Sequence, residues 1–398
     1  MDKLKNILLL IFSVYLPLLF FEYYFLINKK ALYPNYDAMR IEKSQERTSR
    51  VNNLIKEARS NNFQRNIYID EIKLFSYRYN IFPIGTVPNK DIYYCDEGYG
   101  LVTFKSDRFG LRNNDSVWSS NSLKNKNQTF FIGDSYIQGA CVENNQTISE
   151  LFRKFRHKDN IVNLGSSGIG PNDYRAILKL IVEPTLKYSQ QKTDVILTFY
   201  ANDRTRIKKF DKNQEDLLYK SVAIVETSQK NKGIFPTNFY VESLNEIVRE
   251  NINLKPSLSK GDISNRLFLP DFKLSNLQYF LKNRVKATPF FSSYLNQSFN
   301  KTYTYKAINA LRTTCKKKCN PYIIYIPNSE FWRPDSTANT YKNNISETAS
   351  KFGIPFLDTT EIINPRNNKN YALEGPHLSP LGYEKVAKGI YQFVLDNQ

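Results

Sequence analysis

The chain has 398 residues, which exceeds one average domain and allows either one large domain with insertions or two smaller ones. Hydrophobic residues make up 41% of it, enough for a sizeable core, and the formal net charge is +18, carried by lysines that are scattered along the chain. Scattered lysines favour a solvated basic surface, and attraction to an acidic polysaccharide or an anionic lipid surface is the alternative. The sequence has no zinc-finger spacing, RNP-like stretch or basic heptad region, so we expect no nucleic-acid partner.

Residues 7–27 form an apolar run that is interrupted only by Ser13 and Glu22. A helix needs about 20 such residues to cross a bilayer, so the run predicts a transmembrane segment. No small-residue cleavage site follows, which favours a retained signal anchor over a cleaved signal peptide; an ordinary buried helix is the alternative. We therefore expect residues 1–28 to comprise a cytoplasmic tip and a membrane anchor.

The chain has four cysteines, which are Cys95, Cys141, Cys315 and Cys319. An even, small number suits two disulfides in an oxidising compartment. We predict that Cys95 pairs with Cys141 and Cys315 with Cys319, and that the part of the chain after the anchor lies outside the cytoplasm. The spacing of the second pair is not that of a metal finger, and the chain has only two histidines, so we expect no metal site.

Residues 29–125 are expected to form a stalk and an accessory region. The first part, 35–75, is polar and charged with weak helical periodicity, whereas 80–120 is richer in glycine, proline and aromatic residues, which indicates short strands and turns. Arg112, in the stretch FGLRNND, is expected either to pair with a carboxylate beneath a site or to be a surface arginine.

From Thr129 onward, short apolar runs alternate with amphipathic stretches. The apolar runs predict five strands at 129–134, 160–168, 194–203, 321–328 and 354–361. The amphipathic stretches predict helices at 147–158, 171–188 and 337–352 and a last helix that closes the chain. This alternation predicts a doubly wound α/β domain with a parallel sheet over residues 126–398, whose ligands bind beyond the carboxyl ends of the strands.

Residues 205–300 interrupt the alternation with charged runs and aromatic residues. We interpret them as an insertion after the third strand that lies over the strand ends, where it could cover a substrate.

Three of the five predicted strands end in polar residues: Asp134-Ser135, Ser166-Ser167-Gly168 and Asn202-Asp203. In a parallel sheet these ends share one edge, so the residues could converge on one site. A serine hydroxyl needs a base to take its proton, and that base is usually histidine. His377 lies in a loop between the last strand and the last helix, at the same predicted edge, whereas His157 lies in a basic helix end.

A serine nucleophile also needs hydrogen-bond donors for the oxyanion that develops on its substrate. The backbone N–H groups of Ser135 and Gly168 and the side-chain amide of Asn202 are the candidate donors. Gly168 suits this role because a residue without Cβ lets the backbone approach the reacting carbonyl. We assign structural roles near the site to Asp134, which is expected to shape the turn before Ser135, and to Asp203.

Four short blocks, GDS at 133–135, NLGSSGIGP around Gly168, FYAND around Asn202 and EGPH ending at His377, resemble those of the SGNH/GDSL hydrolase superfamily, in the same chain order. The resemblance covers roughly residues 126–398 and implies a flavodoxin-like α/β/α sandwich. It also implies a serine nucleophile, an oxyanion hole of serine N–H, glycine and asparagine, and a histidine base. DRFGLRN, GDSYIQGACV and NLGSSGIGPNDY are similar to the membrane-anchored, extracytoplasmic bacterial branch, whose members hydrolyse esters or move acetyl groups onto polysaccharides.

One position departs from the pattern of the superfamily, which has aspartate three residues before the histidine. Glu374 stands there and could orient His377 as the third member of a triad. In the alternative, Glu374 is incidental and a backbone carbonyl orients the histidine of a Ser–His dyad.

The sequence thus predicts a serine esterase or O-acyltransferase without a cofactor. The expected substrate is an acylated glycan or lipid-linked molecule of the cell envelope, with acetyl as the expected acyl group. Residues 7–27 are expected to anchor the chain, as a single-pass protein, in a bacterial inner membrane with the catalytic domain outside the cytoplasm. The rival hypothesis is a catalytically silent member of the fold that binds glycan or scaffolds an envelope assembly, with 205–300 as its binding element.

Overall fold

The structure is a computed structural model that describes residues 13–24, 28, 35–69, 81–189, 191–204, 206, 215–223, 242, 246, 303–335 and 337–398. The predicted anchor over 7–27 and the predicted insertion over 205–300 therefore lie partly or largely outside the described residues. Within them, residues 13–24 are helical, and no helix combines the length and the apolar character that a membrane crossing requires. The membrane anchor stays a prediction.

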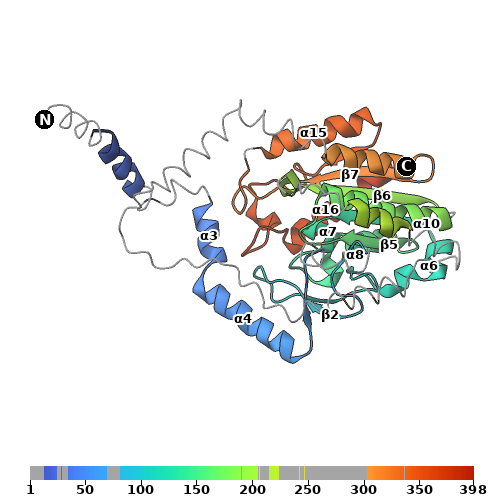
Figure 1. Ribbon diagram of the computed structural model, residues 1–398, viewed down its shortest axis with the longest axis horizontal. Helices are drawn as coiled ribbons and strands as arrows, with labels where there is room; N and C mark the ends of the chain where they lie inside the picture. The colour runs from blue at the N-terminus through green and yellow to red at the C-terminus, as the bar shows by residue number, and fades with distance from the viewer. Residues whose placement is uncertain are drawn as a thin grey trace.

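A five-stranded sheet forms the centre of the protein (Figure 1). Its spatial order is β5-β4-β6-β7-β8, and every neighbouring pair is parallel. When the strands of this sheet are numbered 1 to 5 in chain order, their spatial order is 2-1-3-4-5. This is the order of flavodoxin-like folds, and it confirms the expected α/β architecture. The strands are β4 (Gln128–Gly133), β5 (Asn160–Gly165), β6 (Thr193–Tyr200), β7 (Asn320–Ile326) and β8 (Phe356–Asp358).

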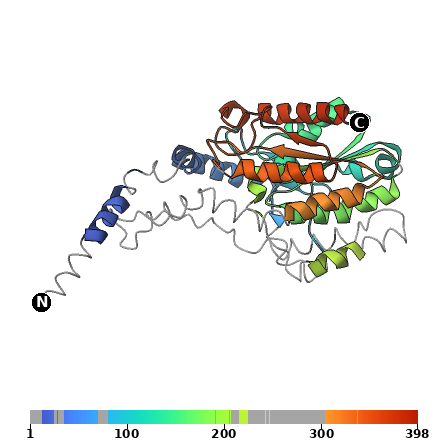
Figure 2. The ribbon, with the colours of Figure 1, turned by 90° about the horizontal axis from the view of Figure 1, so that it is seen from above.

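Helices cover both faces of the sheet, and Figure 2 shows α16 on one side and the helix at 303–315 on the other. The first face carries α8 (Ile148–Phe155) and α16 (Pro380–Asp396), and the second carries α9 (Pro171–Ile177), the helix at 303–315 and α15 (Ala338–Lys351). The predicted single helix over 171–188 is instead α9, a π-helical turn η3 (Leu178–Val182) and α10 (Glu183–Tyr188). Pro184 accounts for the irregular turn, because proline has no N–H and its ring clashes with the preceding turn of a regular α-helix.

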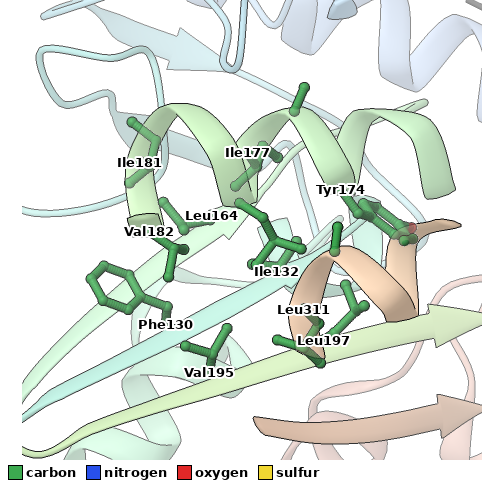
Figure 3. Packing of buried hydrophobic residues seen from close by; sticks show 14 of the residues in the cluster. Phe130, Ile132, Leu164, Tyr174, Ile177, Ile181, Val182, Val195, Leu197 and Leu311 are labelled. Carbon is green, nitrogen blue, oxygen red and sulfur yellow. The ribbon is translucent and has the colours of Figure 1, made fainter. Parts of the chain in front are cut away.

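Alternate side chains of each strand enter two separate hydrophobic clusters. Phe130 and Ile132 of β4 and Leu197 of β6 pack under α9 and η3 (Figure 3), whereas Phe131 and Ile196 pack against α8 and α16. A parallel sheet that is buried on both faces reads as nearly continuous apolar runs, which explains why the strands could be located from sequence.

Residues 35–69 and 81–125 form a smaller layer that packs against this domain and shares one of its hydrophobic clusters. It contains α3 (Tyr36–Glu42), α4 (Gln45–Ser60), β1 (Gln64–Arg65), β2 (Asp91–Tyr93), β3 (Thr103–Lys105), η1 (Asp115–Trp118) and α6 (Ser120–Asn125). β2 lies between β1 and β3, parallel to the first and antiparallel to the second. The weak periodicity of 35–75 thus corresponds, within the described residues, to two helices and a short strand.

Covalent and polar contacts tie this layer to the sheet domain. Cys95 is bonded to Cys141, with 5.1 Å between the Cα atoms, and Cys315 is bonded to Cys319, so both predicted pairings are confirmed. Arg112 is buried and donates to the carbonyls of Gly139 at 2.6 Å and Val142 at 2.9 Å. The sequence suggested either a surface arginine or the partner of a carboxylate, and Arg112 is neither. It instead binds backbone carbonyls of the segment that follows the GDS block.

Candidate active site

Ser135 lies at the carboxyl end of β4, as the first residue of the short helix α7 (Ser135–Gln138). Asp134 caps this helix, and its Oδ1 accepts a hydrogen bond from the backbone N–H of Tyr136 at 3.0 Å. Gly139 ends the helix in the left-handed region, with φ of 82°. The Asp134 cap before α7 and the Gly139 turn after it hold the Ser135 hydroxyl at the edge of the sheet where ligands of such folds bind.

His377 reaches Ser135 from the loop between β8 and α16. Its Nε2 lies 3.0 Å from Ser135 Oγ. The Tyr136 hydroxyl supports the loop by donating to the Pro376 carbonyl at 2.7 Å, and the N–H of Ala372 donates to the His377 carbonyl at 2.8 Å. The second histidine, His157, is exposed beyond the end of α8, in agreement with its exclusion as the base.

The carboxylate beside His377 is Glu97, in the loop between β2 and β3. Its Oε1 lies 2.7 Å from His377 Nδ1, and its Oε2 accepts from the His377 backbone N–H at 3.0 Å. A carboxylate accepts hydrogen bonds only, so Nδ1 carries the proton and the lone pair of Nε2 faces Ser135. Ser135, His377 and Glu97 thus form one hydrogen-bonded chain of the kind that activates a serine.

Glu374 does not contact His377, which corrects its predicted role as the orienting carboxylate. Its carboxylate is held by both terminal nitrogens of Arg50, with 3.1 Å between Arg50 Nη1 and Glu374 Oε1. The physical reason is twofold: an arginine on α4 offers a bidentate partner on one side, and Glu97 already occupies Nδ1 of the histidine on the other.

Gly375 explains how Glu97 can come so close to the histidine loop. A Cβ at position 375 would overlap the carboxylate group of Glu97. Glycine in the E-G-P-H block therefore leaves the space that the Glu97 carboxylate fills, and any larger residue there would displace it.

Gly168 and Asn202 follow the two strands that flank β4. Gly168 lies three residues beyond β5 with φ of 79°, a conformation that favours glycine, and a Cβ there would come within 3.3 Å of Tyr68 Cδ1. Asn202 lies in the 3-10 turn η4 (Ala201–Arg204), directly after β6. Both candidate donors therefore share the sheet edge of Ser135, one on either side of it.

Two buried carboxylates and an arginine lie beneath this edge. Asp134 Oδ2 lies 2.7 Å from Arg206 Nη1, and Asp203 Oδ2 accepts from the Tyr174 hydroxyl at 2.8 Å. Burial and the neighbouring charge of Asp134 raise the pKa of Asp203 well above its ordinary value. Burial would lower the pKa of Arg206, but the charges of Asp134 and Asp203 outweigh it and raise that pKa. Arg206, which sequence analysis did not single out, therefore stays charged and fixes the capping carboxylate of α7.

One atom each of Glu97, His377 and Cys141 lie within 4.8 Å of one another, as in a metal site. The sulfur is bonded to Cys95, and the glutamate and histidine are hydrogen-bonded to each other. Each of the three groups therefore already has a partner, the sulfur in a disulfide and the other two in a hydrogen bond.

No protein-family model and no curated protein matches the chain. Among solved structures, it is similar to a member of the lipolytic G-D-S-L family from Veillonella parvula, with a TM-score of 0.36 and 10% identity over 67% of this chain and 97% of the other. A protein assigned to the same family from Desulfitobacterium hafniense gives a TM-score of 0.34 and 11% identity, over 67% and 98% of the two chains. One assigned as an SGNH hydrolase from Slackia heliotrinireducens gives 0.35 and 7%, over 68% and 100%.

Proposed function

We propose that this protein is an SGNH-type serine esterase or O-acyltransferase that works through an acyl-enzyme on Ser135. The observation that carries the proposal is the continuous hydrogen-bonded chain from Ser135 Oγ through His377 to the Glu97 carboxylate. A protein that only bound a ligand would have no use for a serine whose proton faces a histidine oriented by a carboxylate.

In the first half of the reaction, Ser135 Oγ attacks the carbonyl carbon of an ester while its proton passes to His377 Nε2. Glu97 stabilises the imidazolium that results and keeps Nδ1 protonated. The N–H groups of Ser135 and Gly168 and the amide of Asn202 are the proposed donors to the oxyanion. The tetrahedral intermediate then expels the alkoxide, which takes the proton from Nε2, so that the acyl group stays on Ser135.

In the second half, a hydroxyl attacks the acyl-enzyme and passes its proton to His377 Nε2, which returns it to Ser135. Water as the acceptor gives hydrolysis, and a sugar hydroxyl gives transfer of the acyl group. Hydrolysis and transfer use the same residues of the protein. Which of them occurs depends on whether a bound acceptor excludes water from the acyl-enzyme.

The proposed substrate is an acylated glycan or lipid-linked molecule of a bacterial envelope, with acetyl as the acyl group. Three features support this: the apolar run at 7–27, which predicts an anchor in the inner membrane; two disulfides, which suit an extracytoplasmic compartment; and the net charge of +18. Anchoring favours substrates that are themselves held in the envelope over freely diffusing ones.

The test is covalent labelling of the full-length chain in detergent with a fluorophosphonate, followed by intact-mass analysis. We expect one adduct on the wild type, none on Ser135→Ala and labelling slowed by about 10³-fold or more in His377→Ala. Ser122→Ala, which changes a buried serine in α6, is the matched control and should label as the wild type does.

An unlabelled, folded wild type would overturn the proposal, provided that a known serine esterase is labelled in parallel. That result would favour the rival hypothesis of a catalytically silent glycan-binding protein. Labelling that persists in Ser135→Ala would show that another residue is the nucleophile.

A further inference from the structure

We propose that Arg50, on α4 of the predicted stalk, is a positioning residue that holds Glu97 against His377. This inference rests on the proposed function, since it assigns Glu97 a part in catalysis. Figure 1 shows α3 and α4 beside the sheet domain, in the region that the sequence predicted to be a stalk. The inference makes that helix part of the active enzyme.

Arg50 binds two carboxylates at once. Its terminal nitrogens hold Glu374 in a bidentate pair, and its Nε lies 3.3 Å from Asp96 Oδ2. The guanidinium stays charged at every pH of an assay, because the hydrogen bond to Glu374 raises its pKa further above the ordinary value of arginine. Arginine suits this position because its planar fork can satisfy two partners in fixed directions.

The two carboxylates are neighbours of the catalytic chain. Asp96 directly precedes Glu97, and Glu374 lies three residues before His377. The backbone N–H of Glu374 also donates to the Glu97 carbonyl at 3.0 Å, so the two loops already touch. Arg50 therefore bridges the loop that carries the orienting carboxylate and the loop that carries the base.

Asp96 makes the bridge rigid on the Glu97 side. Its side chain is fully buried, and its Oδ1 accepts from the backbone N–H groups of Gly98 at 2.7 Å, Tyr99 at 3.2 Å and Gly100 at 3.1 Å. Arg47, one turn before Arg50 on α4, donates to the Asp96 carbonyl at 2.9 Å, and its Nε lies 3.3 Å from Glu374 Oε2, so it supports the same bridge. Loss of the arginine would leave the second oxygen of a buried carboxylate short of a partner and loosen this turn.

The effect should be intermediate in size, because Arg50 is not the sole constraint on the loop. The disulfide at Cys95 anchors the same segment next to α7, and β2 and β3 flank it. Glu97 should therefore remain near His377 without Arg50 but lose its fixed distance to Nδ1.

The experiment compares fluorophosphonate labelling rates of Ser135 in the full-length wild type and the variants Arg50→Gln and Arg50→Lys. We expect labelling to slow by about 10- to 100-fold in Arg50→Gln and by less in Arg50→Lys, which keeps the charge but cannot hold both carboxylates. Arg108→Gln is the matched control, because it removes another bidentate pair, with Asp115, from the same layer. It should label at the wild-type rate.

A double variant separates positioning from a general structural role. Glu97 binds His377 at Nδ1 and at the backbone N–H, and Arg50 contacts Asp96 and Glu374 on the loops that carry these two residues. Because Arg50 acts through Glu97 in this proposal, Arg50→Gln should slow labelling no further in a Glu97→Gln background. A purely structural arginine would slow labelling by the same factor in both backgrounds.

Labelling of Arg50→Gln within twofold of the wild type would overturn the inference, as would an equal further loss of labelling rate when Arg50→Gln is added to Glu97→Gln. Should Arg50→Gln fail to fold, Glu374→Gln tests the same bridge from its other end, with about a tenfold loss expected and a wild-type rate as the contradicting result. A wild type that is not labelled at all would overturn the proposed function, and this inference with it.

Discussion

Two regions of the molecule build one site by different physical means. The sheet domain supplies Ser135, Gly168 and Asn202 from the ends of three adjacent strands, where the parallel topology alone gathers them. The accessory layer supplies Glu97 from a loop with no regular structure, which a disulfide and an arginine fix in place. The packing of the core and the hydrogen bonds of the sheet fix the position of residues at strand ends. The position of a residue in such a loop depends on each individual contact that the loop makes.

The difference predicts where the site is robust. A strand end is held by two hydrophobic clusters and a ladder of backbone hydrogen bonds, so single substitutions nearby should change chemistry before they change position. The Glu97 loop has few such contacts, so substitutions in its supports should change the geometry of the triad first.

The largest effect is expected for the carboxylate itself. Glu97→Gln keeps the size of the side chain but can hold His377 in the wrong tautomer and gives no charge to the imidazolium. Loss of the equivalent charge in a serine triad costs up to about 10⁴-fold in kcat, and we expect about 10³- to 10⁴-fold here. Steady-state hydrolysis of p-nitrophenyl acetate measures the loss.

Glu374→Gln is the natural comparison, since it removes a carboxylate from the position that the superfamily pattern favours. The structure places this side chain on Arg50, so we expect about a tenfold loss. A larger loss in Glu374→Gln than in Glu97→Gln would reverse the assignment of the two residues.

The sheet domain could be predicted from sequence because its elements repeat a simple pattern. Strands that are buried on both faces give apolar runs, as in TFFIG at the end of β4, and helices between them show their own period. Ser135, Gly168, Asn202 and His377 all follow such elements, so their shared edge could be inferred without any contact being known.

Glu97 was missed because its segment, CDEGYG, has no periodicity and lies 280 residues before His377. A signal was nevertheless present: the predicted disulfide from Cys95 to Cys141 places Asp96 and Glu97 close to the helix that carries Ser135. Glu374 was chosen on sequence spacing, which does not show that Gly375 leaves room for a carboxylate from another layer.

The two disulfides test whether the Glu97 loop depends on its individual contacts. Loss of the disulfide at Cys95 should have the larger effect on both stability and labelling. This disulfide closes a loop across a sequence separation of 46, and the loop-entropy estimate for its removal is about 4 kcal/mol, against about 2 kcal/mol for Cys315–Cys319 with a separation of 4. We expect Cys95→Ser/Cys141→Ser to lower both the free energy of unfolding and the labelling rate of Ser135. Cys315→Ser/Cys319→Ser should lower only the first, as chemical denaturation and labelling on the same samples would show.

The outcome to watch is activity rather than stability. If both double variants label Ser135 at the wild-type rate, the Glu97 loop keeps its position without its disulfide and is as robust as the strand ends.

The smallest change in structure that tests the site is one methyl group at position 375. Gly375→Ala would place a Cβ where the Glu97 carboxylate now lies, so the carboxylate must withdraw from Nδ1, and we expect kcat to fall about 10- to 100-fold. Gly389→Ala, whose Cβ would come closest to side-chain atoms of Ile362, with an overlap at the terminal Cδ1 methyl that this side chain can relieve, is the matched control and should leave kcat unchanged.

A second substitution shows whether the methyl group acts through Glu97. Glu97→Asp shortens the side chain by one methylene, so alone it should lose activity, but in Gly375→Ala it relieves the overlap. Because the two residues compete for one space, the double variant should be no less active than Gly375→Ala, which is a non-additive result. Losses that simply multiply would mean that position 375 affects the histidine loop by another route, and that the space left by this glycine is not what lets the accessory layer complete the triad.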